Sequence, residues 1–332
     1  MKPARRQFLH FITSAAALFA VSNSALAQTA PASTTGTRLI TLGTRAGPNP
    51  TVWRAQTSNV LIVNGIPYII DAGDGVSRRL IRAKIEFRDI EAIFITHPHS
   101  DHTSGLPALL SAQYDSPRTK PLRVYGPPGT EEIVKGILPF LDVNAEIRMS
   151  GGARTVMASQ VFSGHNKEPG VIFEDANIKV TAIENTHFNF EPGTPAYGKY
   201  KSYALRFDTA NRSIVFTGDT GPSAAILGLA KGADLLVSEV MSVEEFRERQ
   251  IQIGRWQLMT PQQQEGIIRH MRQEHLTPEQ VGDIAARAGV KTVVLSHLPT
   301  TTDPRDEYAR FGALVKKNFT GQVLIANDLM EF

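Results

Sequence analysis

The sequence predicts an α/β fold, a four-layer αββα sandwich in which helices flank two mixed β-sheets. Predicted strands occur in two groups, one before residue 126 and one after residue 170, and predicted helices are interleaved with both groups. Histidines and aspartates that could bind a metal follow several of these strands. We therefore expect one large domain whose functional site lies among the loops at one sheet edge.

The first group of strands opens as an antiparallel sheet. Residues 38–42, 59–63 and 67–71 have the apolar, β-branched composition of strands, and glycine-containing turns separate them. Residues 76–83 carry their arginines on one side, which predicts a helix before the apolar strand at residues 91–95. The alternation continues with a helix from Gly105, a strand at residues 122–125 and a helix at residues 129–141.

The second half of the chain is richer in strands. They are predicted at residues 171–174, 178–184, 203–208, 213–217, 234–239, 292–295 and 322–325. Helices are predicted at residues 222–230, at residues 243–274 as one or two amphipathic helices, and after Pro304. The segments 260–263 and 277–280 both read Thr-Pro-x-Gln, which resembles a capping box with proline at the first helical position. They predict two helix starts.

The first 27 residues predict a secretory signal peptide. Arg5-Arg6 precede an uncharged apolar run through Ala20, and Ala25-Leu26-Ala27 forms a small-x-small cleavage site. The apolar run is shorter than the roughly 20 residues that a membrane span needs, so no stable membrane anchor is expected. The paired arginines resemble a twin-arginine signal, which implies a periplasmic protein that is exported and cleaved after Ala27.

Residues 28–37, rich in Ala, Thr, Ser and Pro, predict a flexible leader, and residues 38–332 the folded domain. The chain has 35 basic and 32 acidic residues, and Lys2, Arg5 and Arg6 are the only charges before residue 28, which leaves 32 of each sign in the remainder. A neutral chain gives no support for a general polyanion-binding surface. Nucleic acid is therefore not expected as a partner, and the absence of cysteine excludes disulfides and thiolate ligands.

The most informative stretch is His97-x-His99-x-Asp101-His102, directly after the strand at residues 91–95. At His97 and His99 the chain is still nearly extended, so these two side chains, two residues apart, can point to the same side of the chain. Asp101 and His102 begin the next turn, so their side chains point in another direction. One loop thus offers two sets of ligands. Imidazole and carboxylate together suit zinc and its first-row neighbours, so two Zn²⁺ are the expected cofactors, with Mn²⁺ or Fe²⁺ as alternatives.

This motif resembles the signature of the metallo-β-lactamase superfamily of binuclear hydrolases. The other ligands of that family match His187, Asp219 and His297, each after a predicted strand. The resemblance implies the αββα fold, a hydroxide between the two ions as nucleophile, and a division of the ligands into two sets and a bridge. The first set would be His97, His99 and His187, the second Asp101, His102 and His297, and the bridge Asp219.

Further stretches resemble the ribonuclease Z branch of that superfamily and its arylsulfatase-like and phosphodiesterase relatives. They are residues 42–48, 71–75, 105–107 and 275–280. The chain departs from ribonuclease Z because Ser100 replaces a glycine and because the segment between His187 and Asp219 is too short for a long tRNA-gripping arm. Together with predicted export, these departures favour a small phosphodiester or sulfate ester over transfer RNA as substrate.

Asp101 and His275 are the candidate catalytic residues. His275 lies outside the ligand set, but the cap at Thr277 places it before a helix whose following strand leads to His297. We expect it to be the general acid that protonates the leaving oxygen, the alternative being a helix-end histidine in solvent. His165 and His270 are interpreted as solvated.

Other interpretations stay open at this level. The aromatic residues of segment 188–200 could form a substrate wall or could pin the loop to the core. With such a wall, the same metals could serve a lactone or β-lactam hydrolase, and a non-catalytic metal-binding domain is a third class. The helical segment 243–274, longer than the ligand framework requires, could form a lid or the surface of a homodimer.

Overall fold

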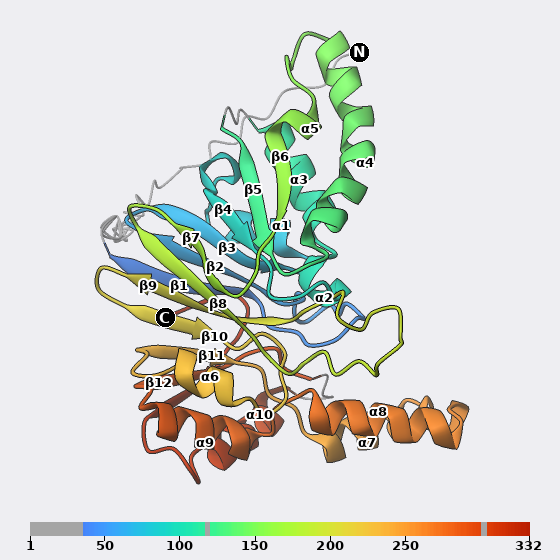
Figure 1. Ribbon diagram of the computed structural model, residues 1–332, viewed down its shortest axis with the longest axis vertical. Helices are drawn as coiled ribbons and strands as arrows, with labels where there is room; N and C mark the ends of the chain where they lie inside the picture. Colours follow the sequence, from blue (N-terminus) through green and yellow to red (C-terminus); the bar gives the residue numbers. More distant parts are fainter. Residues whose placement is uncertain (1–35, 117–119, 300–303) are drawn as a thin grey trace, which may run out of the picture. The chain divides into compact units, whose positions relative to one another are not determined.

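The computed structural model describes residues 36–116, 120–299 and 304–332. The predicted signal peptide and most of the predicted leader lie outside these residues. The described chain forms two β-sheets packed face to face, with helices on both outer sides (Figure 1). The predicted αββα sandwich is therefore confirmed.

The first sheet has the strand order β14-β1-β2-β3-β4-β5-β6. Strands β14 to β3 pair antiparallel, and β3 to β6 pair parallel. In chain order these strands are β1 (Thr37–Gly43), β2 (Ser58–Val63), β3 (Ile66–Ala72), β4 (Ala92–Phe94), β5 (Leu122–Gly126), β6 (Phe162–Asn166) and β14 (Met330–Glu331).

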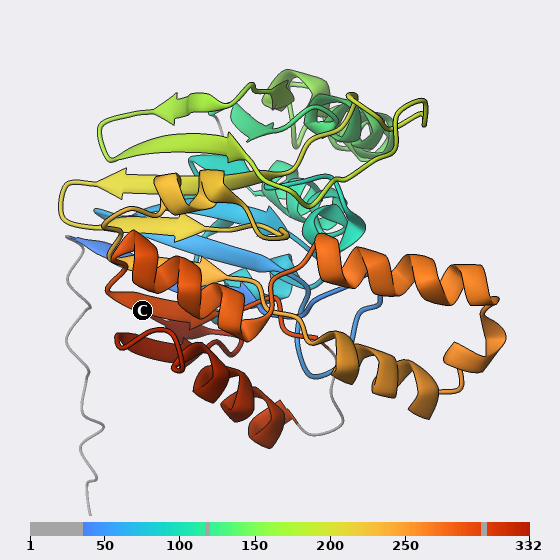
Figure 2. The ribbon, with the colours of Figure 1, turned by 60° about the horizontal axis from the view of Figure 1, so that its bottom comes forward.

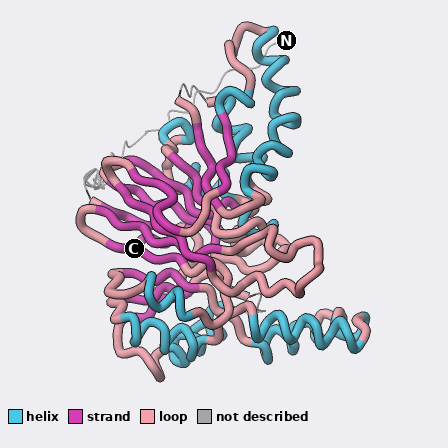
Figure 3. The backbone as a smooth tube through the Cα atoms, viewed as in Figure 1, coloured by secondary structure: helices cyan, strands magenta, loops and turns pink. Residues whose placement is uncertain are grey.

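The second sheet repeats this design with the order β13-β12-β11-β10-β9-β8-β7. Strands β7 to β10 are antiparallel, and β10 to β13 are parallel. The strands are β7 (Gly170–Glu174), β8 (Ile178–Glu184), β9 (Tyr203–Thr209), β10 (Ser213–Phe216), β11 (Leu235–Ser238), β12 (Thr292–Leu295) and β13 (Gln322–Ile325). Long loops, residues 44–57 after β1 and 185–202 after β8, extend beyond the strand ends, as Figure 3 shows.

Three apolar cores hold the layers together, and the alternation of side chains along each strand divides residues among them. In β4, for example, Ala92 and Phe94 face the core between the sheets, while Ile93 faces the helices outside the first sheet. Helices α1 (Val76–Arg82), α3 (Leu106–Asp115) and α4 (Thr130–Ser150) supply that outer layer, and α6 (Ala224–Leu229), α9 (Pro278–Ala288) and α10 (Pro304–Val315) cover the second sheet. Burial on both faces explains why the central parallel strands β4, β10, β11 and β12 are almost wholly apolar.

Segment 243–274 forms two helices, α7 (Val243–Gln252) and α8 (Pro261–Gln273), which lie side by side as a projecting arm (Figure 2). A 3₁₀ turn, Trp256–Leu258, lies between them. Met241 and Val243 pack against Met271 in a small apolar core at the base of the arm. Capping boxes at Thr260 and Thr277 start α8 and α9, as predicted.

Several elements differ from the sequence prediction, among them α4, β6 and the unpredicted short strand β14. Helix α4 runs through Pro139 to Ser150 instead of ending near residue 141, because Leu141 and Ala145 continue to bury against the first sheet and this packing outweighs the backbone hydrogen bond that proline removes. Strand β6 was not predicted, since Ser163, Gly164 and His165 lack strand composition; its backbone pairs with β5 along its whole length. Among the described helices, none is long and apolar enough to cross a membrane.

Candidate metal centre

The seven predicted metal ligands come together although they belong to separate loops. His97 and His99 follow β4, Asp101 and His102 lie on the short helix α2 (Ser100–Thr103), and the other three follow β8, β10 and β12. Their nitrogen and oxygen atoms form two clusters, in each of which the candidate ligand atoms lie within 4.8 Å of one another. One cluster contains His97, His99 and His187, and the other contains Asp101, His102, Asp219 and His297.

In the first cluster, His99 Nδ1 lies 3.2 Å from His97 Nε2 and 3.1 Å from His187 Nε2. Tetrahedral coordination with metal–nitrogen bonds of about 2.0–2.1 Å places ligand atoms roughly 3.3 Å apart, so these spacings fit a metal ion. The His187 ring is held from behind, since its Nδ1 donates to the Glu274 carbonyl oxygen at 3.0 Å. That hydrogen bond leaves Nε2 as the atom able to bind a metal.

In the second cluster, His297 Nε2 lies 3.1 Å from Asp219 Oδ2 and 3.3 Å from Asp101 Oδ2. His102 Nε2 and Asp219 Oδ1 are buried, and neither has a hydrogen-bond partner among the described residues. Leaving a buried imidazole nitrogen and carboxylate oxygen without a partner is costly, and a divalent ion would satisfy both. The residues therefore fit a metal ion here as well.

Asp219 lies between the clusters. Its Oδ2 is 3.8 Å from both His97 Nε2 and His187 Nε2, while its Oδ1 is 3.4 Å from His102 Nε2. One carboxylate thus faces ligands of both sets. This is the position that a bridging ligand requires.

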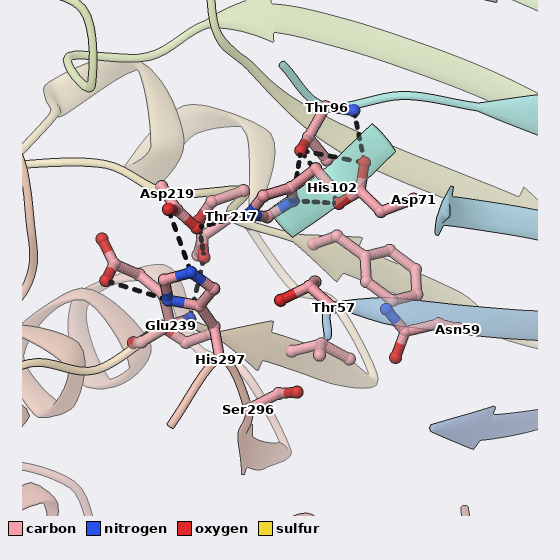
Figure 4. A pocket seen from close by; sticks show the side chains of 14 residues that line it. Thr57, Asn59, Asp71, Thr96, His102, Thr217, Asp219, Glu239, Ser296 and His297 are labelled. Atoms are coloured by element: carbon pink, nitrogen blue, oxygen red, sulfur yellow. Dashed lines mark hydrogen bonds and ion pairs between the residues drawn. The ribbon is translucent and has the colours of Figure 1, made fainter. Parts of the chain in front are cut away.

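Other residues fix the ligands in place (Figure 4). The Asp71 carboxylate accepts from the Thr96 backbone N–H at 2.8 Å and lies 2.8 Å from His102 Nδ1, which turns His102 Nε2 toward Asp219. The Gly47 backbone N–H donates to Asp101 Oδ2 at 2.7 Å. Asp71 and His297 both have positive φ, +58° and +48°, a strained conformation that non-glycine residues keep where the site requires it.

The family model described as "Beta-lactamase superfamily domain" matches residues 68–298, a range that contains all seven residues. The chain belongs to the metallo-β-lactamase superfamily. Relatives include proteins named ribonuclease Z: the one from Mycobacterium sp. strain KMS is 29% identical over 292 residues, covering 87% of this chain and 94% of the relative. The one from Methanosarcina mazei is 26% identical over 336 residues, covering 89% and 97%.

Solved structures show the same fold at low identity. The metallo-β-lactamase-fold protein YhfI from Bacillus subtilis aligns with a TM-score of 0.62 and 18% identity, covering 89% of this chain and 98% of that one. The short form of human tRNase Z aligns at 0.57 and 21%, covering 89% and 98%. A diphosphatase from the PhnP family aligns at 0.57 and 17%, covering 89% and 96%.

The two ligand clusters of this metallo-β-lactamase-fold protein differ in their affinity for protons. Burial, together with the neighbouring histidines, lowers the pKa of His97 and of His187 well below the usual value, so these rings are neutral. In the second cluster burial also acts to lower the pKa values, but Asp219 and the other carboxylates outweigh it. They raise the pKa of His102 well above its usual value and that of His297 to about 10.

This difference predicts that the two clusters load metal with different pH dependence. In the metal-free protein, protons must leave His102 and His297 before these rings can bind an ion, whereas His97 and His187 carry none. Lowering the pH from about 8 to about 5 should therefore empty the second cluster first. Calorimetric metal titrations in buffers of different ionisation enthalpy would count the protons released, and equal release for both equivalents would contradict the prediction.

His275 lies beside the ligands and is buried, with 5% of the residue exposed, so the solvent-exposed alternative is wrong. Its Nδ1 is 2.7 Å from Glu239 Oε2, and the other Glu239 oxygen accepts from the Thr220 backbone N–H at 2.7 Å. The ring lies 5.1 Å from that of His187. Burial lowers the pKa of His275, but the charge and hydrogen bond of Glu239 outweigh burial and raise it overall.

Three residues near the centre were not assigned a role from the sequence. Asp71 and Glu239 hold His102 and His275, as described above. His270 was interpreted as solvated, but only 34% of its side chain is exposed, and its ring lies 5.2 Å from that of His275 and 5.7 Å from that of His187. Its Nδ1 is 2.8 Å from Oε2 of Glu274, the residue four positions later that directly follows α8. That i, i+4 pair directly before His275 was the sequence signal that could have identified it.

His165, also interpreted as solvated, is partly buried on β6, away from the ligands. Its ring stacks on Tyr125 at 5.3 Å, and its Nε2 lies 2.9 Å from Ser163 Oγ. His165 is therefore less solvated than predicted, because the unpredicted strand places its ring against a neighbouring aromatic side chain. His165 makes no contribution to either ligand cluster.

The aromatic segment after His187 lies against the ligands only at its start. Phe188 lies 5.2 Å from the His187 ring, 5.1 Å from the His99 ring and 5.0 Å from Phe190, so it forms an apolar wall beside the first cluster. Tyr197, by contrast, is 55% exposed. The wall is therefore built by the residues closest to the ligand, and the rest of the loop extends into solvent.

A small polar cavity of about 30 Å³ lies next to the second cluster, between the two sheets. Asn59, Ser296 and His297 line it, as Figure 4 shows, and Asn59 Oδ1, Ser296 Oγ and His297 Nδ1 have no hydrogen-bond partner among the described residues. The cavity has the size and polarity of an internal water site. Such a site would orient the outer nitrogen of His297.

Proposed function

We propose that this protein is a binuclear, zinc-dependent hydrolase that cleaves a phosphodiester or sulfate ester of a small molecule. The observation that carries the proposal is the position of Asp219, whose carboxylate lies within 3.8 Å of imidazole nitrogens of both ligand sets. Superfamily membership and the two clusters of potential ligands support a metal-dependent hydrolase. Because nitrogen and oxygen ligands discriminate poorly among first-row metals, Mn²⁺ and Fe²⁺ are the alternatives to zinc.

The proposed mechanism assigns each residue a task. His97, His99 and His187 would hold one ion, Asp101, His102 and His297 the other, and Asp219 both. Two such ions supply an activated water as nucleophile and neutralise the charge of the ester oxygens.

The protein's own groups orient these ligands and move the proton. The Asp71 carboxylate orients His102, and the Gly47 N–H orients Asp101. The Glu274 carbonyl orients His187. Glu239 binds Nδ1 of His275, so Nε2 is the atom that delivers a proton to the leaving oxygen.

The substrate class is the finer part of the proposal. The relatives named ribonuclease Z and the PhnP-family diphosphatase support phosphorus–oxygen chemistry, and the former keep nucleic acid among the substrates to be tested. Two features favour a small ester. The chain after residue 27 has no net charge. The projecting α7–α8 arm lies between Asp219 and His297, whereas the tRNA-gripping arm of ribonuclease Z would lie between His187 and Asp219.

A substrate panel tests the proposal. Zinc-loaded protein should hydrolyse bis(p-nitrophenyl) phosphate or p-nitrophenyl sulfate faster than an acyl-homoserine lactone or nitrocefin. Faster lactone or nitrocefin hydrolysis would instead favour the carbonyl-directed alternative, for which the Phe188–Phe190 wall would bind an apolar substrate. Cleavage of precursor transfer RNA at a higher kcat/KM than any small ester would overturn the small-molecule assignment, and no turnover of any substrate would favour a metal-binding domain.

We also propose that the protein acts in the periplasm, on the basis of Arg5-Arg6 and the Ala25-Leu26-Ala27 site. Changing both arginines to lysine should leave uncleaved, folded precursor in the cytoplasm, as measured by fractionation and N-terminal sequencing. A variant changed at Lys2 alone serves as the control and should be exported. Normal amounts of mature double variant in the periplasm would replace the twin-arginine route with general secretion.

A further inference from the structure

Arg45 is a buried cation without an evident partner. It follows β1, and 9% of the residue is exposed. Its Nε has no hydrogen-bond partner, and no ion pair joins its guanidinium to a carboxylate among the described residues. The backbone is firmly held, because the N–H donates to the Ala55 carbonyl at 3.0 Å and the carbonyl accepts from Thr57 Oγ1 at 3.2 Å.

Arg54 provides a direct comparison within the same loop. It is 8% exposed, but its Nη1 donates to Thr44 Oγ1 and to the Ala326 carbonyl, and its Nη2 donates to Asn327 Oδ1. Arg54 is thus a structural residue that ties the loop to the segment after β13. Arg45 is equally enclosed but makes none of these bonds, and burying a charge without partners costs stability. Residues that break this rule are concentrated at functional sites.

The position of Arg45 relates it to the second ligand cluster. Its backbone forms a β-bridge with Leu298, the residue after His297, and Gly47, two residues further on, donates to Asp101. Burial lowers the pKa of Arg45; Tyr308 and then the Asp101 carboxylate counteract part of that lowering, while Arg249 of α7 and Arg54 lower the pKa further. The backbone around Arg45 is thus attached on both sides to residues of the second cluster, to Leu298 after His297 and to Asp101 through Gly47.

We propose that Arg45 binds the anionic group of the substrate, a phosphoryl or sulfuryl oxygen, next to the Asp101–His297 side of the centre. This inference rests on the proposed function and names the residue that selects its substrate class. A guanidinium presents its donors in a planar fork that matches two oxygens of a phosphate or sulfate. The bound anion supplies the counter-charge and the hydrogen-bond acceptors that Arg45 lacks.

The test compares Arg45→Leu, Arg45→Lys and Arg54→Leu in the metal-loaded enzyme. Binding of inorganic phosphate, measured by calorimetry, should weaken about ten- to one-hundredfold in Arg45→Leu and less in Arg45→Lys, which keeps the charge but loses the fork. Metal content should stay unchanged. The Tm of Arg45→Leu should stay equal or rise, because an unpaired buried charge is removed, whereas Arg54→Leu should lower the Tm.

Unchanged phosphate affinity in Arg45→Leu, or a lowered Tm together with metal loss in both Arg45 variants, would assign the residue to structure and overturn the inference. The experiment also separates this failure from failure of the proposed function, because phosphate binding is measured without turnover. If no ester of the panel is hydrolysed but phosphate affinity still depends on Arg45, the anion site stands and the hydrolase assignment falls.

Discussion

Asp219→Ala should reduce hydrolysis by about 10³-fold or more and should lower the metal content. Asp219 is the only described residue whose carboxylate faces imidazoles of both clusters, so its loss removes a ligand from each. Loss of the charge stabilisation that bound metal gives to the transition state costs several kcal/mol, and each 1.36 kcal/mol is a factor of ten in rate. Elemental analysis of protein purified without chelator should give close to two equivalents in the wild type and fewer in the variant.

Asp71→Asn is the matched control for this experiment. It changes a carboxylate that holds His102 from behind, and asparagine tolerates the positive φ found at Asp71. The expected loss of metal affinity or activity is about 10- to 100-fold, clearly less than for Asp219→Ala. If the wild type consistently contained one equivalent, and neither Asp101→Ala nor His297→Ala changed that value, the binuclear interpretation would be wrong.

His275→Ala should slow alkyl esters far more than nitrophenyl esters while metal content stays unchanged. A general acid contributes about 10²- to 10⁴-fold, and it contributes most when the leaving group is a poor one. His275 is suited to this role because Glu239 holds its Nδ1, which leaves Nε2 to carry the proton. The measurement is kcat/KM across esters whose leaving groups rise in pKa.

The Glu239→Gln variant separates proton transfer from a structural role. The Glu239 carboxylate raises the pKa of His275, so removing its charge should lower that pKa. His275 would then lose its proton at lower pH, and the alkaline limb of the rate profile should move to lower pH. Equal losses for all leaving groups in His275→Ala, with an unmoved limb in Glu239→Gln, would assign this pair to substrate binding or structure.

The motif from His97 to His102 could be recognised in the sequence because its four metal-binding side chains lie close together in one loop and short helix. The resemblance to the superfamily then identified His187, Asp219 and His297, each of which comes within three residues of the end of a strand. Supporting residues were harder to recognise. Asp71 ends β3, 25 residues before its partner Thr96, and Glu239 is separated from His275 by the entire arm. Neither residue has a local pattern that reveals its partner, since each contact joins segments that are far apart in the chain and meet only in the folded protein.

Fold prediction succeeded where local signals agreed with tertiary packing. The caps at Thr260 and Thr277 are formed by residues within the same turn, so the sequence alone determines them. Strand β6 depends instead on a neighbour, because its polar sequence becomes a strand only by pairing with β5. The extension of α4 beyond Pro139 likewise depends on burial at Ala145.

The α7–α8 arm joins Glu239 to His275, yet the two residues meet at its base, where Met241 N–H also donates to the Leu276 carbonyl at 2.8 Å. The base is thus closed independently of the tip. The outer turns around residues 252–261 can be lengthened or shortened without separating His275 from Glu239, because lengthening a closed loop costs little free energy. The outer turns of the arm are therefore free to change in length and sequence while the contacts at its base stay in place.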